Sequence, residues 1–319
     1  MNLLKNNALL IVFVSIIVFS SCDNEENANA KKETLYGLTS QNDDLSSLKR
    51  AIELTGLNTT LEGTEPLTVF APSNTAFSNY LAENGFASIE NVPVNILRQV
   101  ILNHVVSGKI IEQNLPVNTY IKSNATGYAS SSNNLSLYFR RVDGIVSING
   151  VADLTGGTLL ASNGIIHKID HVLDLPSIMD HIVANPNLSV LADALNTNTD
   201  FDFVAELSSI NNGPYTLIAP LNSGFSTLSS DIPQPASQAT MAEVLKYHVA
   251  LTSNSLSTSL TDGMVINTFE GSTFTIQSTP ANFRIKDYNN RLANFTTKDI
   301  QCYNGIIHIV DRFLKPNLN

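Results

Sequence analysis

The chain has 319 residues, with 28 acidic and 18 basic side chains and a formal net charge of −10 at pH 7. Binding to nucleic-acid phosphates requires clustered Lys and Arg side chains, so this balance argues against a nucleic-acid partner. The negative charge also disfavours electrostatic docking on anionic lipid.

The first residues, 1–21, indicate a lipoprotein signal peptide. Lys5 supplies a positive charge, and residues 8–19 form an apolar run that is shorter than the roughly 20 residues needed to span a bilayer. The run stops just before Cys22, and the small residues before this cysteine resemble a lipobox, so Cys22 is the expected lipidation site. An ordinary secretory peptide with an incidental cysteine is the alternative. Lipidation would leave Cys302 as the only free thiol and would exclude an intrachain disulfide.

Residues 22–33 are predicted to form a flexible tether, because they are polar and lack apolar periodicity. Their early acidic residues resemble signals that sort some lipoproteins to the outer leaflet of an outer membrane; a solvated spacer is the alternative. Removal of Lys5 would take the formal charge from −10 to −11, so membrane attachment is expected through the acyl chains. The expected location is the cell envelope, at the outer membrane and exposed at the surface, with the leaflet left open.

Three segments occur twice in the same order, at separations of 148, 144 and 141 residues, measured from Thr68, His104 and His167. The drift is what loop deletions in the second copy would give, and the separation is too long for a solenoid repeat of about 20 to 50 residues. The sequence therefore predicts a duplicated domain, each copy long enough to bury a core. The paired segments are TVFAPSNTAF (68–77) and TLIAPLNSGF (216–225), NHVV (103–106) and YHVA (247–250), and NGIIHKIDHVLDLP (163–176) and NGIIHIVDRFLKP (304–316).

Helices are predicted early in the first copy. Asp43 and Asp44 suit the first turn of a helix whose apolar residues follow at near-helical spacing. After a short apolar run over 67–70 that Pro72 stops, a second main helix is predicted over 94–106. One apolar stripe on this helix comprises Leu97, Val100, Ile101, His104 and Val105.

Asn74 is predicted to cap the helix that carries Phe77. It matches Asn222 in the second copy, whereas the neighbouring Ser73 is replaced there by Leu221. Because Asn is a preferred N-cap residue, the shared Asn is the better candidate in both copies.

Strands dominate the rest of the first copy. Asp143-Gly144 predicts a hairpin turn between strands over 135–139 and 145–148. Asn163-Gly164 predicts a second turn, which leads into an alternating strand. The second copy repeats this order. Helices are predicted over 188–195 and 241–249, and strands around 217–219, 265–269, 273–276 and 306–310. Residues 287–290 predict a hairpin turn rather than a calcium loop.

The paired segments resemble the signatures of the fasciclin domain, over residues 34 to 316. The resemblance implies an α+β fold with two tandem fasciclin-like domains, 34–176 and 177–316, each a small β-sandwich or wedge with several helices. With almost no linker at Pro176, the domains should touch. The resemblance also implies an extracellular role in adhesion, without chemistry. Two positions depart from the family pattern: Asn103 stands where Tyr is common, and Leu221 stands where Ser or Thr is common.

The middle segments carry a candidate adhesion motif. Tyr247 and His248 resemble the Tyr-His pair of adhesive relatives, and Asn103 and His104 occupy the same positions in the first copy. The alternative is that these four side chains are structural, in which case substitution would act by unfolding the local helix. The Asn103 departure makes the second domain the better candidate for adhesion.

The remaining chemistry-bearing residues favour structural roles. His104, His248, His167 and His308 lie among inward aliphatic residues, where a histidine is more often a hydrogen-bonded core residue than a ligand. His181 has no Cys or acidic ligand at metal-site spacing, so no metal and no cofactor are expected. Motifs of hydrolases, P-loop proteins and dinucleotide-binding proteins are missing from the sequence, so we expect no enzyme.

The sequence therefore predicts a lipid-anchored, non-catalytic adhesion or interaction protein of the cell envelope. Its expected partner is a surface protein or a polysaccharide. The alternative is a glycan-binding accessory lipoprotein of a polysaccharide-uptake system. The polar stretches 131–136 and 253–261 are expected to be loops that could contact sugars, but the chain has no Trp for stacking on a sugar face.

Overall fold

A computed structural model describes residues 32–209, 211, 213–232, 235–251, 253–279 and 282–318. The predicted signal peptide, Cys22 and all but the last two residues of the predicted tether lie outside the described residues. The chain divides into Met1–Lys32 and one compact unit, Glu33–Asn319, which contains both repeats. None of the helices among the described residues has the length and apolar character needed to cross a bilayer.

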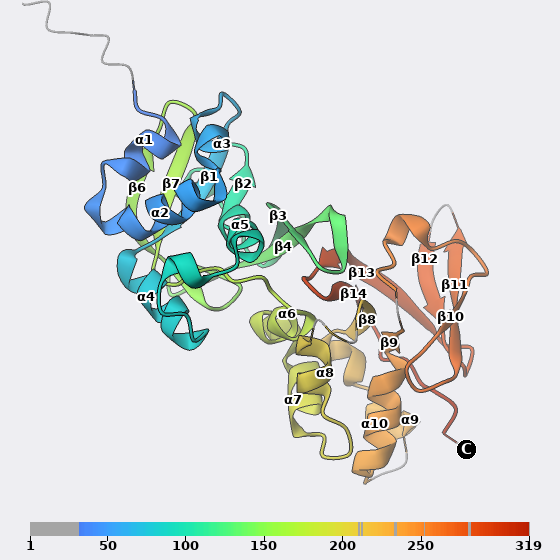
Figure 1. The fold of residues 1–319 in the computed structure, drawn as a ribbon. Coiled ribbons are helices and arrows are strands. Elements are labelled where there is room, and N and C mark those ends of the chain that lie inside the picture. The colour runs from blue at the N-terminus through green and yellow to red at the C-terminus, as the bar shows by residue number, and fades with distance from the viewer. Residues whose placement is uncertain are drawn as a thin grey trace, which may run out of the picture. The chain divides into compact units, whose positions relative to one another are not determined.

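Each repeat combines short helices with seven strands (Figure 1). The first repeat contains helices α1 (Leu35–Ser40), η1 (Asp43–Leu45), α2 (Ser46–Thr55), α3 (Asn58–Glu62), α4 (Asn74–Glu83), η2 (Ile89–Asn91), α5 (Val94–Asn103) and η3 (Glu112–Asn114). Its strands are β1 (Leu67–Pro72), β2 (Val105–Ser107), β3 (Thr119–Gly127), β4 (Ser130–Val142), β5 (Ile145–Ile148), β6 (Ala152–Leu160) and β7 (Gly164–Ile169).

The second repeat follows the same plan. Its helices are α6 (Ile178–Ala184), η4 (Pro186–Leu188), α7 (Ser189–Thr197), α8 (Phe203–Ser208), η5 (Asn222–Phe225), α9 (Leu228–Asp231), α10 (Gln238–Tyr247) and η6 (Ser257–Ser259). Its strands are β8 (Tyr215–Pro220), β9 (Val249–Ala250), β10 (Val265–Asn267), β11 (Thr273–Thr279), β12 (Asn282–Lys286), β13 (Leu292–Gln301) and β14 (Gly305–Val310).

The strand order is the same in the two sheets. It runs β2-β1-β7-β6-β5-β4-β3 in the first repeat and β9-β8-β14-β13-β12-β11-β10 in the second. The two central strands are parallel, β1 with β7 and β8 with β14, and the other pairs are antiparallel. The predicted α+β fold with two copies of one domain is therefore confirmed.

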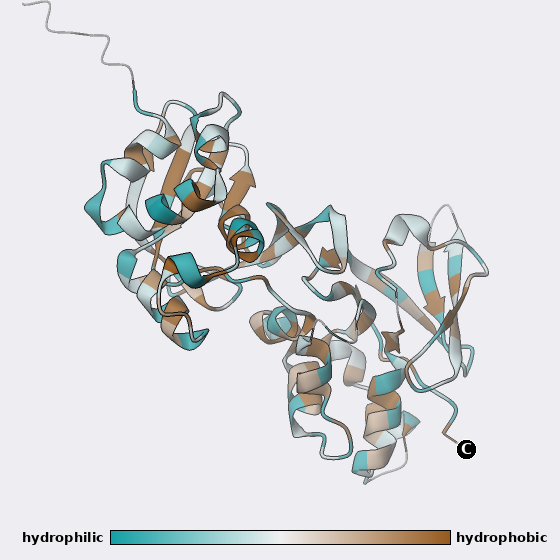
Figure 2. Ribbon diagram, in the orientation of Figure 1, coloured by the Kyte–Doolittle hydropathy of each residue, from teal (hydrophilic) through white to brown (hydrophobic). Residues whose placement is uncertain are grey.

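Two cores lie on opposite faces of the central strands in each repeat. Val69 and Ile166 pack with the helices, whereas Phe70 and Ile169 pack with residues of β4 and β5 such as Phe139. The far strands of the sheet therefore fold back over its second face, which gives the wedge. Strands covered on both faces need continuous apolar runs, and Figure 2 shows hydrophobic residues along these central strands.

The predicted hairpin at Asp143-Gly144 is present. Both residues have positive φ, 49° and 86°, as a two-residue turn between twisted strands requires. Residues 287–290 likewise form the turn between β12 and β13, with Asn290 at φ 60°.

Two predicted element boundaries are wrong. The helix predicted over 94–106 ends at Asn103, and Val105 pairs with Val69 as part of β2; likewise Val249 belongs to β9 rather than to α10. The β-branched residues gain a ladder with the central strand, and this outweighs extending the helix. The stretch 131–136, predicted as a loop, belongs to strand β4, whose polar side chains hydrogen-bond to β3.

The N-cap prediction for Asn74 and Asn222 is also wrong. Ser73 caps α4 by accepting a hydrogen bond from the Ala76 N–H, and Leu221 makes no side-chain cap. The Asn74 Oδ1 instead accepts a 2.9 Å hydrogen bond from the Ser47 N–H. The Asn side chain therefore caps the preceding helix, α2, across space. Asn222 does the same for α7 by accepting a 3.0 Å hydrogen bond from the Val190 N–H.

Candidate functional site

The four residues of the candidate adhesion motif lie inside the two repeats. Asn103, His104 and Tyr247 are 0% exposed and His248 is 1% exposed. A partner therefore cannot touch these side chains while the ends of α5 and α10 remain folded.

The two motif histidines join the helix ends to the last segment of each repeat. The Nδ1 of each histidine lies 2.7 Å from the carbonyl oxygen four residues earlier. The Nε2 of His104 accepts a 2.8 Å hydrogen bond from the Leu173 N–H, and the Nε2 of His248 accepts one of the same length from the Leu314 N–H. The ring must therefore be neutral, with its proton on Nδ1. Burial lowers the pKa of both histidines to about 4.

Asn103 and Tyr247 reach different parts of their repeats. The Asn103 Nδ2 donates a 2.8 Å hydrogen bond to the carbonyl of Asp174, on the segment after β7. The Tyr247 hydroxyl donates to the Thr273 carbonyl on β11 and accepts from the Tyr288 N–H, at 2.8 and 2.9 Å. The Asn103 and Tyr247 side chains thus differ in which segments of their own repeat they hydrogen-bond to.

His167 and His308 occupy equivalent places on the central strands. Each Nε2 donates a 2.8 Å hydrogen bond to a backbone carbonyl, of Ile110 or Ser255 respectively. The Nδ1 of His308 accepts a 3.2 Å hydrogen bond from the Asp299 N–H. Both rings therefore hold the loop after β2 or β9 against the sheet, as hydrogen-bonded core residues do.

Asn163 and Asn304 are structural residues that sequence reasoning missed by treating them as turn residues. Each Oδ1 accepts a 2.9 Å hydrogen bond from the first N–H of α1 or α6, and each Nδ2 donates to two carbonyls near the end of α3 or α8. The next residue is glycine because a Cβ there would collide with the carbonyl oxygen of Leu67 or Tyr215. The signal was available, since the same five residues, NGIIH, begin both closing segments.

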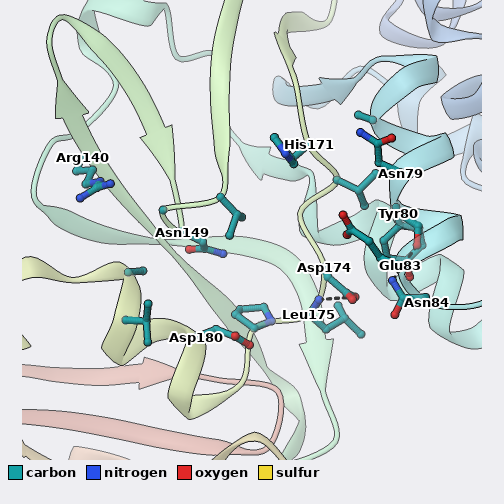
Figure 3. Close-up of a pocket in the computed structure, with 17 residues that line it drawn as sticks. Asn79, Tyr80, Glu83, Asn84, Arg140, Asn149, His171, Asp174, Leu175 and Asp180 are labelled. Carbon is teal, nitrogen blue, oxygen red and sulfur yellow. Dashed lines mark hydrogen bonds between the residues drawn. The ribbon is translucent and has the colours of Figure 1, made fainter. Parts of the chain in front are cut away.

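A pocket of about 770 Å³ lies where the two repeats meet (Figure 3). Asn79, Tyr80 and Glu83 reach it from α4, and Arg140 reaches it from β4 on the other side. Its remaining lining comes from the β5–β6 turn, the segment after β7, and α6, and includes Asn149, Val151, Asp174, Leu175, Asp180 and Val183. Concave sites with a few converging polar groups are the usual places for ligands.

The pocket is predominantly acidic. Its lining includes three carboxylates, those of Glu83, Asp174 and Asp180, against one guanidinium group, that of Arg140, and the imidazole of His171. Asp180 is engaged in the capping box of α6, and Asp174 accepts a 2.8 Å hydrogen bond from the Leu175 N–H, drawn in Figure 3. Burial in the pocket wall, and then the nearby Asp180 charge, raise the pKa of the Asp174 carboxyl. A cationic group beside Asp174 would stabilise the ionised carboxylate and lower this pKa.

Tyr120 of the first repeat anchors the junction. Its ring packs against the core of the second repeat and lies 5.6 Å from the ring of His181. Its hydroxyl accepts a 3.1 Å hydrogen bond from Asn185 Nδ2. Burial, and then the nearby charge of Lys122, lower the pKa of His181 to about 3.

Backbone contacts close the junction beside Tyr120. The Lys122 ammonium donates a 2.8 Å hydrogen bond to the Asp299 carbonyl, and the Gln301 N–H donates a 3.0 Å hydrogen bond to Ser136 Oγ. A Cβ at Gly127 would lie 2.8 Å from the Cα of Tyr303, so only glycine allows this approach. These contacts hold the repeats as one unit.

Across the described ranges, no three His, Cys, Asp or Glu side chains are grouped as ligands for a metal ion. Cys302 is buried, and burial raises the pKa of its thiol well above the usual value. Neither observation points to chemistry at the pocket.

The fold and the junction define a tandem pair of α+β modules. The chain belongs to the Fasciclin domain family, whose model matches residues 43–176 and 186–316. It is 29% identical to periostin from Homo sapiens over 277 residues, which cover 85% of this chain and 31% of periostin. It is 24% identical to fasciclin-1 from Drosophila melanogaster over 341 residues, which cover 97% of this chain and 47% of that protein.

The chain thus spans from about a third to about half the length of these two relatives. A solved FAS1 domain pair from the insect cell adhesion molecule fasciclin I is also similar, with 21% identity and a TM-score of 0.47, covering 89% of this chain and 96% of that one. Family membership places the chain among proteins built from fasciclin domains.

Proposed function

We propose that this chain is a lipid-anchored, non-catalytic adhesion protein of the cell envelope, which binds a surface protein or polysaccharide. The observation that carries the proposal is the fixed junction of two fasciclin domains with a polar pocket beside it. Anchoring rests on the sequence around Cys22. Two acyl chains are needed for stable attachment, because one chain binds a membrane only marginally.

The pocket, rather than the Tyr247-His248 pair, is the better candidate for contact with a partner. Both motif residues are buried, whereas Glu83 is exposed in the pocket and Val183, another lining residue, is 62% exposed. Protein-binding surfaces combine apolar and polar side chains, and both kinds line the pocket.

The test compares attachment of the full-length protein to cells or matrix-coated surfaces. Glu83→Gln with Asp174→Asn should weaken attachment, because the substitutions remove two pocket charges and preserve side-chain size. Glu65→Gln, on an exposed loop outside the pocket, is the matched control. Equal attachment of the wild type, the double variant and the control would exclude the pocket as the site that contacts the partner. No attachment by the wild type, together with a positive sugar-hydrolysis assay, would refute adhesion as the function.

The anchor is tested separately. Cys22→Ala should give an uncleaved precursor that a fatty-acid analogue cannot label, whereas the wild type should be labelled and recovered with membranes. Wild-type protein recovered soluble and free of lipid would exclude the anchor and leave the adhesion test unaffected.

Glycan binding is the second candidate function, favoured by the amides of Asn79, Asn84 and Asn149 in the pocket. Amides and carboxylates suit sugar hydroxyl groups. Among the described residues, however, the strongly exposed aromatic side chains are Tyr128 and Tyr288, one on each repeat. Binding to a polysaccharide panel that Asp174→Asn abolishes would favour this candidate over a protein partner.

A further inference from the structure

The junction joins two different surfaces. The first repeat contributes its β3–β4 hairpin, through Tyr120 and Ser136; we call this the hairpin surface. The second repeat contributes the end of β13 and the residues after it, including Gln301 and Tyr303; we call this the edge surface. Because the repeats share one fold, each also carries an equivalent of the surface that its neighbour uses.

The strand registers identify which residues of the second repeat match the hairpin surface and which residues of the first repeat match the edge surface. Ile121 pairs with Leu137, and Ile266 pairs with Phe274, at matching places in the two sheets. Val265 of β10 therefore corresponds to Tyr120, one residue earlier. Counting back three residues from the shared Asn163 and Asn304 places Leu160 at the position of Gln301.

Each of the two matching surfaces exposes an aliphatic residue at a position that is covered in the junction between the repeats. Gln301 is 0% exposed, whereas Leu160 is 52% exposed. Tyr120 packs on the neighbouring core, whereas Val265 is 58% exposed. In addition, β6 pairs with β5 only at Ala152 and Asp153, so its later residues present an open strand edge (labelled in Figure 1).

We infer that the β10–β11 hairpin of one copy docks on the β6 edge of a second copy, repeating between chains the contact that joins the repeats within one chain. The partner is a second copy because Leu160 and Val265 hold the places of Gln301 and Tyr120, which lie on the two sides of the existing junction. Such a head-to-tail contact either closes into a ring or continues as a chain of copies. The position of Lys122 is taken by the neutral Asn267, so the contact lacks this charge and should depend less on salt than a contact made through an ammonium group. This inference does not rest on the proposed function.

The experiment measures the mass of the soluble mature chain by sedimentation over a wide concentration range. The wild type should form larger species as concentration rises, and Leu160→Glu or Val265→Glu alone should each stop growth. Mixing the two variants should give a dimer and nothing larger, since each retains one intact surface. Val94→Glu, at a 54% exposed site on α5, is the matched control.

A second measurement does not depend on the glutamate variants folding. Thr273 holds the place of Ser136, which contacts the Gln301 N–H within one chain. Leu160→Cys and Thr273→Cys chains, mixed under oxidising conditions, should therefore form a mixed disulfide dimer faster than either forms a homodimer. A wild type that stays monomeric at all concentrations, a mixture that gives no dimer, or an equal effect of Val94→Glu would overturn the inference.

Discussion

At the residue scale, the buried histidines make the folded state sensitive to acid. His104 and His248 have folded-state pKa values of about 4, against 6.5 for the unfolded chain. Between these values the unfolded state binds a proton that the folded state excludes. Stability is therefore full above pH 6.5 and is lost as the pH falls towards 4.

Replacing His104 with Gln should reduce this acid sensitivity while lowering stability at neutral pH. One fewer proton is taken up on unfolding, so the slope of unfolding free energy against pH should fall by about 1.4 kcal/mol per pH unit between pH 5 and 6. The lost hydrogen bonds to Val100 and Leu173 should cost about 1–3 kcal/mol at pH 7. Urea unfolding at several pH values measures both, and an unchanged slope would show that His104 does not titrate as described.

At the element scale, short helices are fixed by side chains from other segments. Asn74 and Asn222 cap α2 and α7 from a distance, and Asn163 and Asn304 hold the first N–H of α1 and α6. Helices of six to ten residues are marginal alone, so these side-chain contacts and packing on the sheet decide whether they form.

Asn222→Ala should destabilise the second repeat by about 0.5–2 kcal/mol, the usual cost of a lost cap. Amide exchange in the first turn of α7 should accelerate before that in α10. Ser223→Ala, next to it and without a cap role, is the comparison. If α7 exchanges at its normal rate in Asn222→Ala, the cap across space is not stabilising.

Much of this element-level structure could be predicted from sequence, because the signal was local. The central strands appear in the sequence as short apolar runs, and the dipeptide Asp143-Gly144 predicts the hairpin turn that it forms. The pairing that stops α5 at Asn103 is not local, since it depends on Val69. The pocket could not be predicted from the sequence, because its lining comes from α4, β4 and α6, which lie far apart along the chain.

At the scale of the whole molecule, Tyr120 makes two domains behave as one. Its ring covers the core of the second repeat, and its hydroxyl is bonded to Asn185.

Tyr120→Ala should separate the unfolding of the two repeats. Calorimetry should show one transition for the wild type and two for the variant, with a loss of about 3–5 kcal/mol for an aromatic residue truncated in a packed site. Tyr128→Ala, at a 58% exposed position on the same hairpin, should keep one transition. A single transition in Tyr120→Ala would mean that backbone contacts such as those at Gly127 are sufficient to couple the repeats.

The junction has a consequence for the order in which the molecule can be completed. Translation delivers Tyr120 and Lys122 before Asp299, Gln301 and Tyr303. A prematurely terminated chain would therefore leave the aromatic hairpin uncovered even if its first domain had folded. Exposed surface of this kind is what chaperones and proteases engage. The contact that couples the repeats thus also covers a surface that the first repeat alone would expose.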